Sequence, residues 1–472
     1  FLYDGKYATL LSEYPTYAKD QFDELTDKLT RMLKNGNGLS IFNKVMKSPI
    51  RPSKKLLNEV SAMIEQGDTS AFSLLDDQIV ARNMILDKIR GMRNNGGFKK
   101  SVIIVNGGPG TGKTVIALHI LAELAKLSNN GNGLNVHYAT KSKPLLEGVR
   151  AQIRPGSRLL FSNVSNFLPA TIGENNLDVL LVDEAHRIEQ SANNQYTPSG
   201  KRTDMPQVDT IIRASKITVF FIDDKQAIRG KEIGSSELIR QAAQRWNASV
   251  EECTLTSQFR CNGSDNYLNW LEQVIYNKPV TSSFDRNDFD LEIFDDVQEM
   301  YDAIVEQDNK PGQSARLTAG FCWPWSKNVV NGDLVKDVQI GNFAIPWETT
   351  DKIDFRQLTI RYPRWYEWAY KPLGIKQCGC IYTAQGFEFD YVGVIIGKDL
   401  KYDPISQSII TDKSASKDSE LRKVLKNATM TFDDYVRNIY RVLMSRGMKG
   451  CYLYICDDNL RNYMKSLLDE MK

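Results

Sequence analysis

The sequence predicts an α/β protein in which parallel sheets are flanked by helices. An apolar run at residues 102–105 enters a glycine-rich turn that opens a stretch with helical periodicity. Two further apolar runs, 179–182 and 217–222, have the composition of strands that are buried on both faces. A second series of strands and helices begins near residue 260. Strands that alternate with helices are typical of βαβ units and therefore of parallel sheets.

The bulk composition bounds the class of protein. A chain of 472 residues is too long for one core, so two or three domains are expected. The net charge of only +2 gives no global basic field, and a nucleic-acid groove would have to be locally basic. The 7 scattered cysteines and 3 histidines predict neither a zinc site nor a disulfide framework, which favours a cytoplasmic protein. No apolar run has the length of a membrane span, so no membrane partner is expected.

Residues 1–70 are expected to form a small N-terminal helical segment. Apolar residues fall on one helical face between 22 and 33, and the pattern repeats between 56 and 64. No group of catalytic residues is visible there, so packing against the rest of the protein is the expected role.

A phosphate-binding loop is predicted where the first strand ends. The spacing G-x-x-x-x-G-K-[ST] is met by Gly107, Gly108, Pro109, Gly110, Thr111, Gly112, Lys113 and Thr114. The glycines let backbone N–H groups face one centre, and the following helix adds partial positive charge there. Lys113 would reach the β- and γ-phosphates of ATP, and the Thr114 hydroxyl would bind Mg²⁺. A chance glycine turn is the weaker alternative because the strand and the helix are both in place.

Further polar residues are predicted to belong to the same nucleotide site. Run 179–182 ends in Asp183, which would hold Mg²⁺, and Glu184, which would polarise the attacking water. A solvated acidic turn is the alternative. Gln78 can read the adenine edge because an amide both donates and accepts, although a surface glutamine is an equal reading of this residue alone. Gln226, after strand 217–222, would sense the γ-phosphate.

The second half repeats the strand pattern without a phosphate loop. Strands are expected at 316–322, 380–382, 391–396 and 451–456, and a helix at 266–275. Two motifs stand out there, the stretch 383–390 and the stretch 440–447 on the helix before the last strand. Neither motif is informative alone, since an exposed helix arginine is usually solvated.

Taken together and in this order, these segments resemble the superfamily 1 helicase-type ATPases from residue 74 to about residue 456. Within that superfamily, the motif sequences most resemble those of the bacterial Schlafen-like P-loop group. The resemblance is carried by residues 223–226, 257–260, 383–390 and 441–450. The resemblance implies two RecA-like domains, 71–256 and 257–472, with ATP in the cleft between them.

The resemblance also implies roles for individual residues. Gln78 would read adenine, and Gln226 would couple the γ-phosphate to the nucleic-acid side. Arg260 and Arg446 would be arginine fingers, which stabilise transition-state charge only when the two domains close. Gly386 and Glu388 would lie where the ATP cleft meets the nucleic-acid groove.

Candidate residues for that groove come from both halves. Lys141, Ser142 and Lys143 follow strand 136–140, at the strand end where open α/β sheets bind ligands. Single-stranded nucleic acid also needs stacking aromatics, for which a place in the core is the alternative. The candidates are Trp323, Trp325, Trp365, Tyr366 and Trp368.

The expected function is a nucleic-acid-dependent ATPase that uses ATP and Mg²⁺ to translocate on or remodel single-stranded DNA or RNA. No large insertion is evident in either half, so the expectation covers ATP hydrolysis and translocation and leaves strand separation open. An alternative is an ATP-driven switch for a protein partner or for an effector domain upstream of Phe1, since the chain does not begin with Met. A small-molecule kinase is disfavoured because it needs no second RecA-like half.

Overall fold

The computed structural model describes residues 21–33, 56–68, 74, 76–94, 99–108, 110–129, 133–224, 226, 231–256, 265–418, 421 and 431–471. The chain divides into two units, Phe1–Ile50 and Arg51–Lys472. In the first unit the described residues form the predicted helix α2 (Phe22–Leu33). Within the described residues, no helix combines the length and the apolar character that crossing a membrane requires.

The second unit opens with helices and then forms a sheet of six parallel strands. The helices are α4 (Leu56–Ser61), a π-helical turn η3 (Ala62–Gln66) and α5 (Asp76–Asn94). The strand order is β3-β2-β4-β5-β1-β6. The strands are β1 (Ser101–Gly107), β2 (Val136–Thr140), β3 (Phe161–Asn163), β4 (Leu177–Asp183), β5 (Ser215–Ile222) and β6 (Ser249–Leu255). The strands predicted at 102–105, 136–140, 179–182 and 217–222 are present as β1, β2, β4 and β5.

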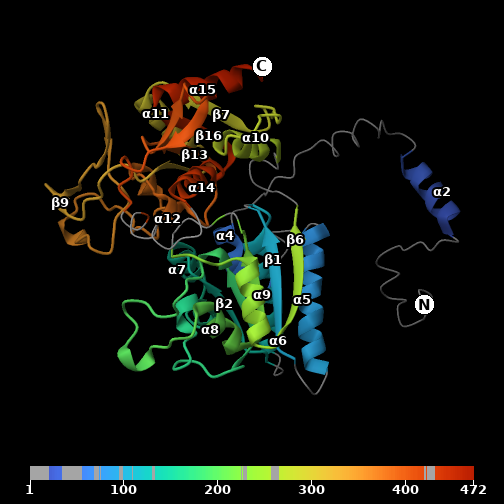
Figure 1. The fold of residues 1–472 in the computed structure, drawn as a ribbon. Coiled ribbons are helices and arrows are strands. Elements are labelled where there is room, and N and C mark those ends of the chain that lie inside the picture. The colour runs from blue at the N-terminus through green and yellow to red at the C-terminus, as the bar shows by residue number, and fades with distance from the viewer. Residues whose placement is uncertain are drawn as a thin grey trace. The chain divides into compact units, whose positions relative to one another are not determined.

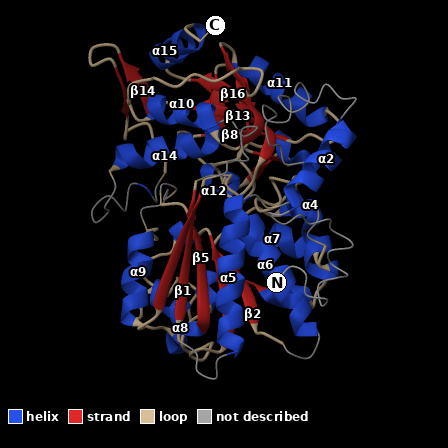
Figure 2. Cartoon of the chain, turned by 90° about the vertical axis from the view of Figure 1, so that its right-hand side faces the viewer, coloured by secondary structure: helices blue, strands red, loops and turns tan. Residues whose placement is uncertain are grey.

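Helices cover both faces of the first sheet, as the continuous apolar strands predicted. Ile103 and Val105 of β1 pack with α5, α6 (Lys113–Asn129) and α7 (Lys143–Gln152). Val102 and Ile104 pack with α8 (Gln207–Ala214) and α9 (Ser236–Arg245). Figure 2 shows β1 and β5 between α9 and α5. The 3₁₀ turns of this half are η4 (Ser157–Leu160), η5 (Val164–Asn166), η6 (Ala185–Arg187) and η7 (Ser199–Lys201).

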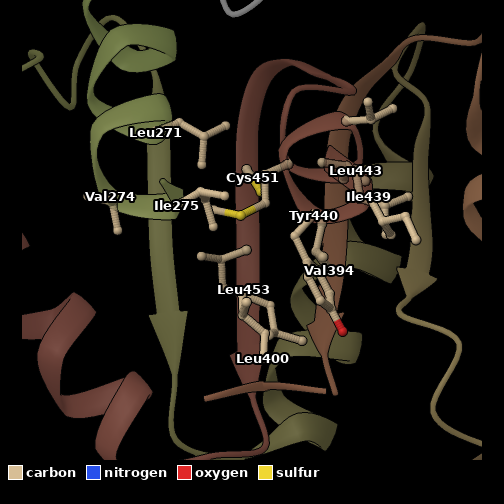
Figure 3. Close-up of a cluster of buried hydrophobic side chains, with 14 of the residues drawn as sticks. Leu271, Val274, Ile275, Val394, Leu400, Ile439, Tyr440, Leu443, Cys451 and Leu453 are labelled. Carbon is tan, nitrogen blue, oxygen red and sulfur yellow. The ribbon is translucent and has the colours of Figure 1, made fainter. Parts of the chain in front are cut away.

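The second sheet has four parallel strands in the order β7-β16-β13-β8. Figure 1 labels β7, β16 and β13 of this sheet, and Figure 2 labels β8. The strands are β7 (Asp290–Phe294), β8 (Ala315–Ala319), β13 (Phe389–Ile396) and β16 (Gly447–Ile455). The helices are α10 (Asp265–Ile275), α11 (Val297–Asn309), α12 (Ile381–Ala384), α14 (Phe432–Met444) and α15 (Asp458–Asp469). One core cluster joins α10 and α14 to β13 and β16, with Val394 and Leu453 among its members (Figure 3). The α/β fold with two parallel sheets is therefore confirmed, whereas the domain boundaries at 70 and 256 stay predictions.

The predicted strand at 380–382 is wrong, because Ile381–Ala384 is the helix α12. The reason is a capping interaction in which the Cys380 N–H donates to Thr383 Oγ1 at 3.2 Å, which outweighs the local β propensity. Strand-like pairing lies just upstream, where Gly379 N donates to Leu317 O at 2.9 Å beside β8.

A loop-rich insertion, residues 320–380, separates β8 from α12. It carries the hairpins β9 (Val329–Val330) with β10 (Asp333–Leu334) and β11 (Val338–Ile340) with β12 (Phe343–Ile345), and the 3₁₀ turns η9 (Phe355–Gln357) and η10 (Pro372–Lys376). A further hairpin, β14 (Leu400–Asp403) with β15 (Ser408–Thr411), follows β13. The insertion was not predictable from the sequence, because its strands are too short to show a period.

Candidate nucleotide site and the adjoining cavity

The turn between β1 and α6 has the backbone that the phosphate-loop pattern predicts. Gly110 and Gly112 have φ of 77° and 81°, in the left-handed region that glycine adopts without steric cost. Space is also restricted, since a Cβ on Gly107 would lie 2.5 Å from Thr111 Oγ1. A Cβ on Gly112 would lie 2.4 Å from Gln78 Nε2. These positions therefore need glycine.

Two side chains fill the space that this loop encloses. Lys113 Nζ donates to the carbonyl oxygens of Gly107 at 2.6 Å and Gly108 at 2.7 Å. The ammonium is thus held on the loop itself, in a buried position. Gln78 of α5 is also buried, and its Nε2 donates to Thr111 O at 2.8 Å. The glutamine predicted to read adenine therefore lies against the loop.

Thr114 and Asp183 meet at the carboxyl end of β4. Asp183 Oδ2 accepts hydrogen bonds from Thr114 Oγ1 at 2.7 Å and from Tyr138 OH at 2.6 Å. The backbone N–H of Glu184 donates to the other oxygen, Oδ1, at 2.9 Å. Burial and the neighbouring Glu184 charge raise the pKa of Asp183, and the hydrogen bonds from Tyr138 and Thr114 oppose that rise.

The Thr114 hydroxyl and the Asp183 carboxylate are the type of donor set that Mg²⁺ accepts. This ion favours a few protein oxygens and completes its shell with substrate phosphates and water. Across the described residues, no group of three or more His, Cys, Asp or Glu side chains is placed to hold a metal alone. The pair fits an ion that is held jointly with a nucleotide.

Glu184 stands in a conformation that is unusual for a side-chain-bearing residue. Its φ of 55° and ψ of 43° lie in the left-handed region, and such strain concentrates at functional sites. Burial works against ionisation, but the charges of His186, Lys113 and Arg187 outweigh it, so the pKa of Glu184 lies below its usual range. A buried carboxylate is thus held in its ionised form.

A residue of the second half reaches this carboxylate through a histidine. His186 Nε2 lies 3.0 Å from Glu184 Oε2, and the same nitrogen lies 2.9 Å from Gln385 Nε2. His186 and Gln385 are both fully buried. Next along the chain, Gly386 has φ of 92°, and a Cβ there would lie 3.4 Å from Ser142 Oγ of the first half. The stretch 383–390 therefore touches the first half at two points.

The remaining predicted residues are placed less centrally. Gln226 is buried, and its Nε2 donates to Asp223 Oδ2 at 2.7 Å. Glu388 is exposed immediately before β13. Pro109 and Arg260 lie outside the described residues.

Arg446 follows α14 and is almost completely buried in its own half. Its Nε donates to Val442 O at 3.0 Å, and its Nη1 donates to Phe387 O at 3.4 Å. The predicted finger is therefore held on carbonyl groups of the second half, one of which follows Gly386 directly.

A cavity of about 1190 Å³ lies between the two halves. From the first half it is lined by the basic residues Lys141, Lys143, Arg187 and Lys231. From the second half it is lined by the aromatic residues Trp325, Trp365 and Tyr382, and it reaches Cys380 and Thr383 beside α12. Two acidic residues, Glu189 and Asp351, also line the cavity, and Glu189 Oε1 lies 2.6 Å from Lys141 Nζ, so the basic charge of the first half is partly neutralised.

One contact spans this cavity. Lys143 Nζ lies 4.9 Å from the ring centroid of Trp365 and 5.5 Å from that of Tyr366. The same nitrogen lies 3.4 Å from Asp351 Oδ2, while Trp365 Nε1 donates to Asp351 Oδ1 at 2.9 Å. The strand-end lysine and the tryptophan predicted for one groove are therefore brought together.

The five candidate aromatics fall into two groups. Trp325 and Trp365 line the cavity, and Tyr366 lies within reach of Lys143. Trp368 has no exposed surface and belongs to the core. A place in the core was the stated alternative to base stacking for each of these aromatic residues. Trp323 packs on a second core cluster and donates Nε1 to Gln339 O at 3.0 Å.

Three residues near the candidate site had no predicted role: His186, Gln385 and Glu348. The first two stood inside recognised motifs, and the position of Gln385 directly before a glycine was the available signal. Glu348 belongs to the insertion, whose lack of periodicity hid it. Its carboxylate is buried and accepts a hydrogen bond from Thr383 Oγ1 at 2.8 Å.

A glycine loop between a strand and a helix, with a carboxylate pair on a neighbouring strand of the same parallel sheet, defines a P-loop protein of the α/β class. The second parallel sheet makes it a P-loop protein with two α/β halves. The sequence profile of the Schlafen group 3 DNA/RNA helicase domain matches residues 100–457. The chain therefore belongs to this family, which confirms the predicted resemblance.

Comparisons with individual proteins are weaker. An uncharacterized protein of Saccharomyces cerevisiae, YPL245W, is 28% identical over 400 residues, which is 76% of this chain and 83% of that protein. The Pif1 helicase of Candida albicans is 11% identical with a TM-score of 0.35, covering 84% of this chain and 100% of that one. DnaA of Aquifex aeolicus with bound AMPPCP is 15% identical with a TM-score of 0.22, covering 43% and 55%. At these scores the two solved structures carry no argument.

Proposed function

We propose that the protein is a nucleic-acid-dependent ATPase that hydrolyses ATP with Mg²⁺ to translocate on or remodel single-stranded DNA or RNA. The observation that carries the proposal is the cavity with basic and aromatic lining, which ends at the same segment that touches Glu184 through His186. A polymer in the cavity and a nucleotide on the loop would both act on that segment.

At the nucleotide, the loop N–H groups and Lys113 would bind the phosphates, since Lys113 Nζ already lies on the loop. Thr114 and Asp183 would hold Mg²⁺, which when bound neutralises charge on the phosphate oxygens. Glu184 would polarise the attacking water, and its lowered pKa keeps the carboxylate ionised for that role.

Further first-half residues would define the nucleotide. Gln78 lies against the loop at Gly112, from where its amide would have to turn toward the adenine edge. Gln226, which donates a hydrogen bond to Asp223, would couple the γ-phosphate to the nucleic-acid side.

The second half would supply charge and coupling. Arg446 would act as an arginine finger once it left the carbonyls of Val442 and Phe387, and Arg260 would be the other finger. Gly386 and Glu388, on either side of Phe387, would connect this movement to the groove.

In the groove, Lys141 and Lys143 would contact phosphates, and Trp325 and Trp365 would stack on bases. Base stacking on an aromatic side chain is worth about 1–3 kcal/mol per base and does not depend strongly on sequence. Lys143 forms an ion pair with the Asp351 carboxylate, and a nucleic-acid phosphate would take the place of that carboxylate.

The test is steady-state ATP hydrolysis without polymer, with single-stranded DNA and with single-stranded RNA, using Lys113→Ala as the blank. Stimulation by one polymer supports the proposal and names its substrate. Trp365→Ala should then raise the half-stimulating polymer concentration about tenfold. Trp323→Ala, in the same insertion but away from the cavity lining, is the matched control and should leave it unchanged.

A rate of ATP hydrolysis that is unchanged by single-stranded DNA and by single-stranded RNA would overturn the proposal and favour the ATP-driven switch. The salt dependence is a second check. Lys143→Ala should reduce the slope of log affinity against log salt by about one if that lysine contacts a phosphate.

A further inference from the structure

The most exposed aromatic side chain among the described residues lies at the wall of the cavity. Tyr196 of the first half is 82% exposed, whereas Trp325 and Trp365, which line the same cavity from the second half, are partly buried. Tyrosine is enriched at binding interfaces because its ring can be buried there while its hydroxyl stays hydrated. The position of this ring therefore suggests a contact with whatever fills the cavity.

The loop that carries Tyr196 runs from Glu189 to Gln207 and is closed at its base. The Glu189 N–H donates to Gln207 Oε1 at 2.9 Å, and an isolated β-bridge pairs Ser191 with Pro206. A closed base fixes where the loop stands relative to the first sheet.

Hydrogen bonds also fix the backbone on both sides of Tyr196. Asn194 Oδ1 accepts from the Tyr196 N–H at 2.8 Å, and Asn194 O accepts from the Thr197 N–H at 3.1 Å. Asn193 Nδ2 donates to Thr203 O at 2.6 Å, and Asn193 Oδ1 accepts from Thr203 N at 3.0 Å. The ring of Tyr196 thus projects from an ordered backbone. A tyrosine presented in this way loses little conformational entropy when it binds.

The part of the cavity wall that this loop supplies suits a flat, uncharged group. The lining residues of the loop include one carboxylate, Glu189, and no lysine or arginine. Glu189 Oε1 lies 2.6 Å from Lys141 Nζ, so this carboxylate is already paired. The loop offers a phosphate no cation of its own, whereas the face of a nucleobase can stack on the Tyr196 ring.

We propose that Tyr196 is a polymer-binding residue that stacks on a base of single-stranded nucleic acid at the first-half wall of the cavity. The inference rests on the proposed function. The strand is then held by aromatic rings from both halves, since Trp325 and Trp365 line the cavity from the second half. Stacking neutralises no phosphate, so this contact contributes affinity without adding to the salt dependence.

The experiment measures the binding of fluorescent oligothymidylate and oligouridylate to the full chain by anisotropy, a readout that does not require ATP hydrolysis. Tyr196→Ala should raise the Kd of the oligomer that wild type prefers by about tenfold, the worth of one stacked base. Tyr196→Phe keeps the ring and should bind like wild type. Tyr196→Ala should also leave the slope of log affinity against log salt unchanged, in contrast to Lys143→Ala.

An abasic oligomer, which is a chain of deoxyribose phosphates without bases, separates stacking from contacts to the backbone. Wild type and Tyr196→Ala should bind this oligomer with equal affinity, because it offers no base to the ring. An abasic oligomer that wild type binds more tightly than Tyr196→Ala does would overturn the inference.

Leu159→Ala is the matched control, because Leu159 is 77% exposed on η4 of the same half and lies outside the described lining of the cavity. It should bind both oligomers like wild type, and melting temperatures check that all variants are folded. A Tyr196→Ala protein that binds like wild type would overturn the inference alone. A wild-type protein that binds neither oligomer would overturn the proposed function, and the inference with it.

Discussion

In the first sheet the candidate site residues follow the carboxyl ends of strands, whereas in the second sheet they precede the amino ends. The phosphate loop follows β1, and Asp183 and Glu184 end and follow β4. In the second sheet, Gln385 and Gly386 lie just before β13, and Arg446 lies directly before β16. The two halves thus contribute from opposite edges of similar sheets.

The carboxyl edge of the second sheet is closed by its own side chains. A Cβ on Gly320 would lie 1.9 Å from Tyr440 OH, and the Gly397 N–H donates to the same oxygen at 2.8 Å. Tyr440 OH in turn donates to Asp399, which is buried. The edge that binds ligands in most α/β sheets is here part of the core. The difference indicates that the connecting loops, and not the sheet, decide which edge carries the candidate site residues.

The largest expected effect would show whether the amino edge of the second sheet takes part in chemistry. Arg446→Ala should lower kcat by about 10³ and leave ATP binding near normal, because a finger acts on transition-state charge. Turnover and nucleotide affinity, measured separately, check this. Unchanged turnover would remove Arg446 from the mechanism.

The control for that variant is Arg437→Ala. Arg437 lies on α14, is buried, and donates to the carbonyl of Ile409 at 2.8 Å and to that of Ile275. Like Arg446 it supports the second half, but it is bound away from the candidate site. It should lower the melting temperature without changing kcat, which separates loss of packing from loss of a finger.

The second prediction compares two carboxylates, Glu184 near the carboxyl edge of the first sheet and Asp399 near the carboxyl edge of the second sheet. Glu184→Gln should lower kcat by roughly 10²–10³, since general acid–base catalysis contributes about that factor. Asp399→Asn should leave kcat within about twofold and destabilise the protein by about 1–3 kcal/mol, because Tyr440 loses a charged acceptor. Equal losses of turnover in both variants would contradict the difference between the edges.

How far the sequence predicted the molecule also differs between the halves. The strands of the first half were predictable because they are buried on both faces and end in a motif with fixed spacing. Contacts such as Gln385 with His186 were not, since they join residues that are distant in sequence and depend on tertiary packing. The helix at Ile381 was missed because a capping side chain outweighed β propensity.

Glu184 of the first half and Glu348 of the second half have pKa values that are shifted in opposite directions, and the pH dependence of stability tests the shift of Glu348. Burial raises the pKa of Glu348 to about 7 from 4.5, against the hydrogen bonds from Cys380 and Thr383. A raised folded-state pKa stabilises the native state below about pH 4.5, and this stabilisation is lost as pH rises to about 7. The loss amounts to roughly 3 kcal/mol.

Glu348→Gln cannot titrate, so it should remove that part of the pH dependence. Unfolding followed between pH 5 and pH 8 should show wild type losing stability relative to the variant as pH rises. Parallel curves for the two proteins would mean that Glu348 is ionised in the folded state as well. Glu306→Gln is the control, because Glu306 is an exposed carboxylate on α11, and it should keep the wild-type pH dependence.

The smallest expected effect concerns the predicted reading of adenine by Gln78 in the first half. Gln78→Ala should reduce the preference for ATP over GTP by about three- to tenfold, the worth of one or two neutral hydrogen bonds. The variant also loses the bond from Gln78 Nε2 to Thr111 O, which supports the loop. Loop damage would raise KM for both nucleotides equally, so the ratio of kcat/KM values is the quantity to measure. A preserved ratio with raised KM would make Gln78 a support of the loop and not a reader of adenine.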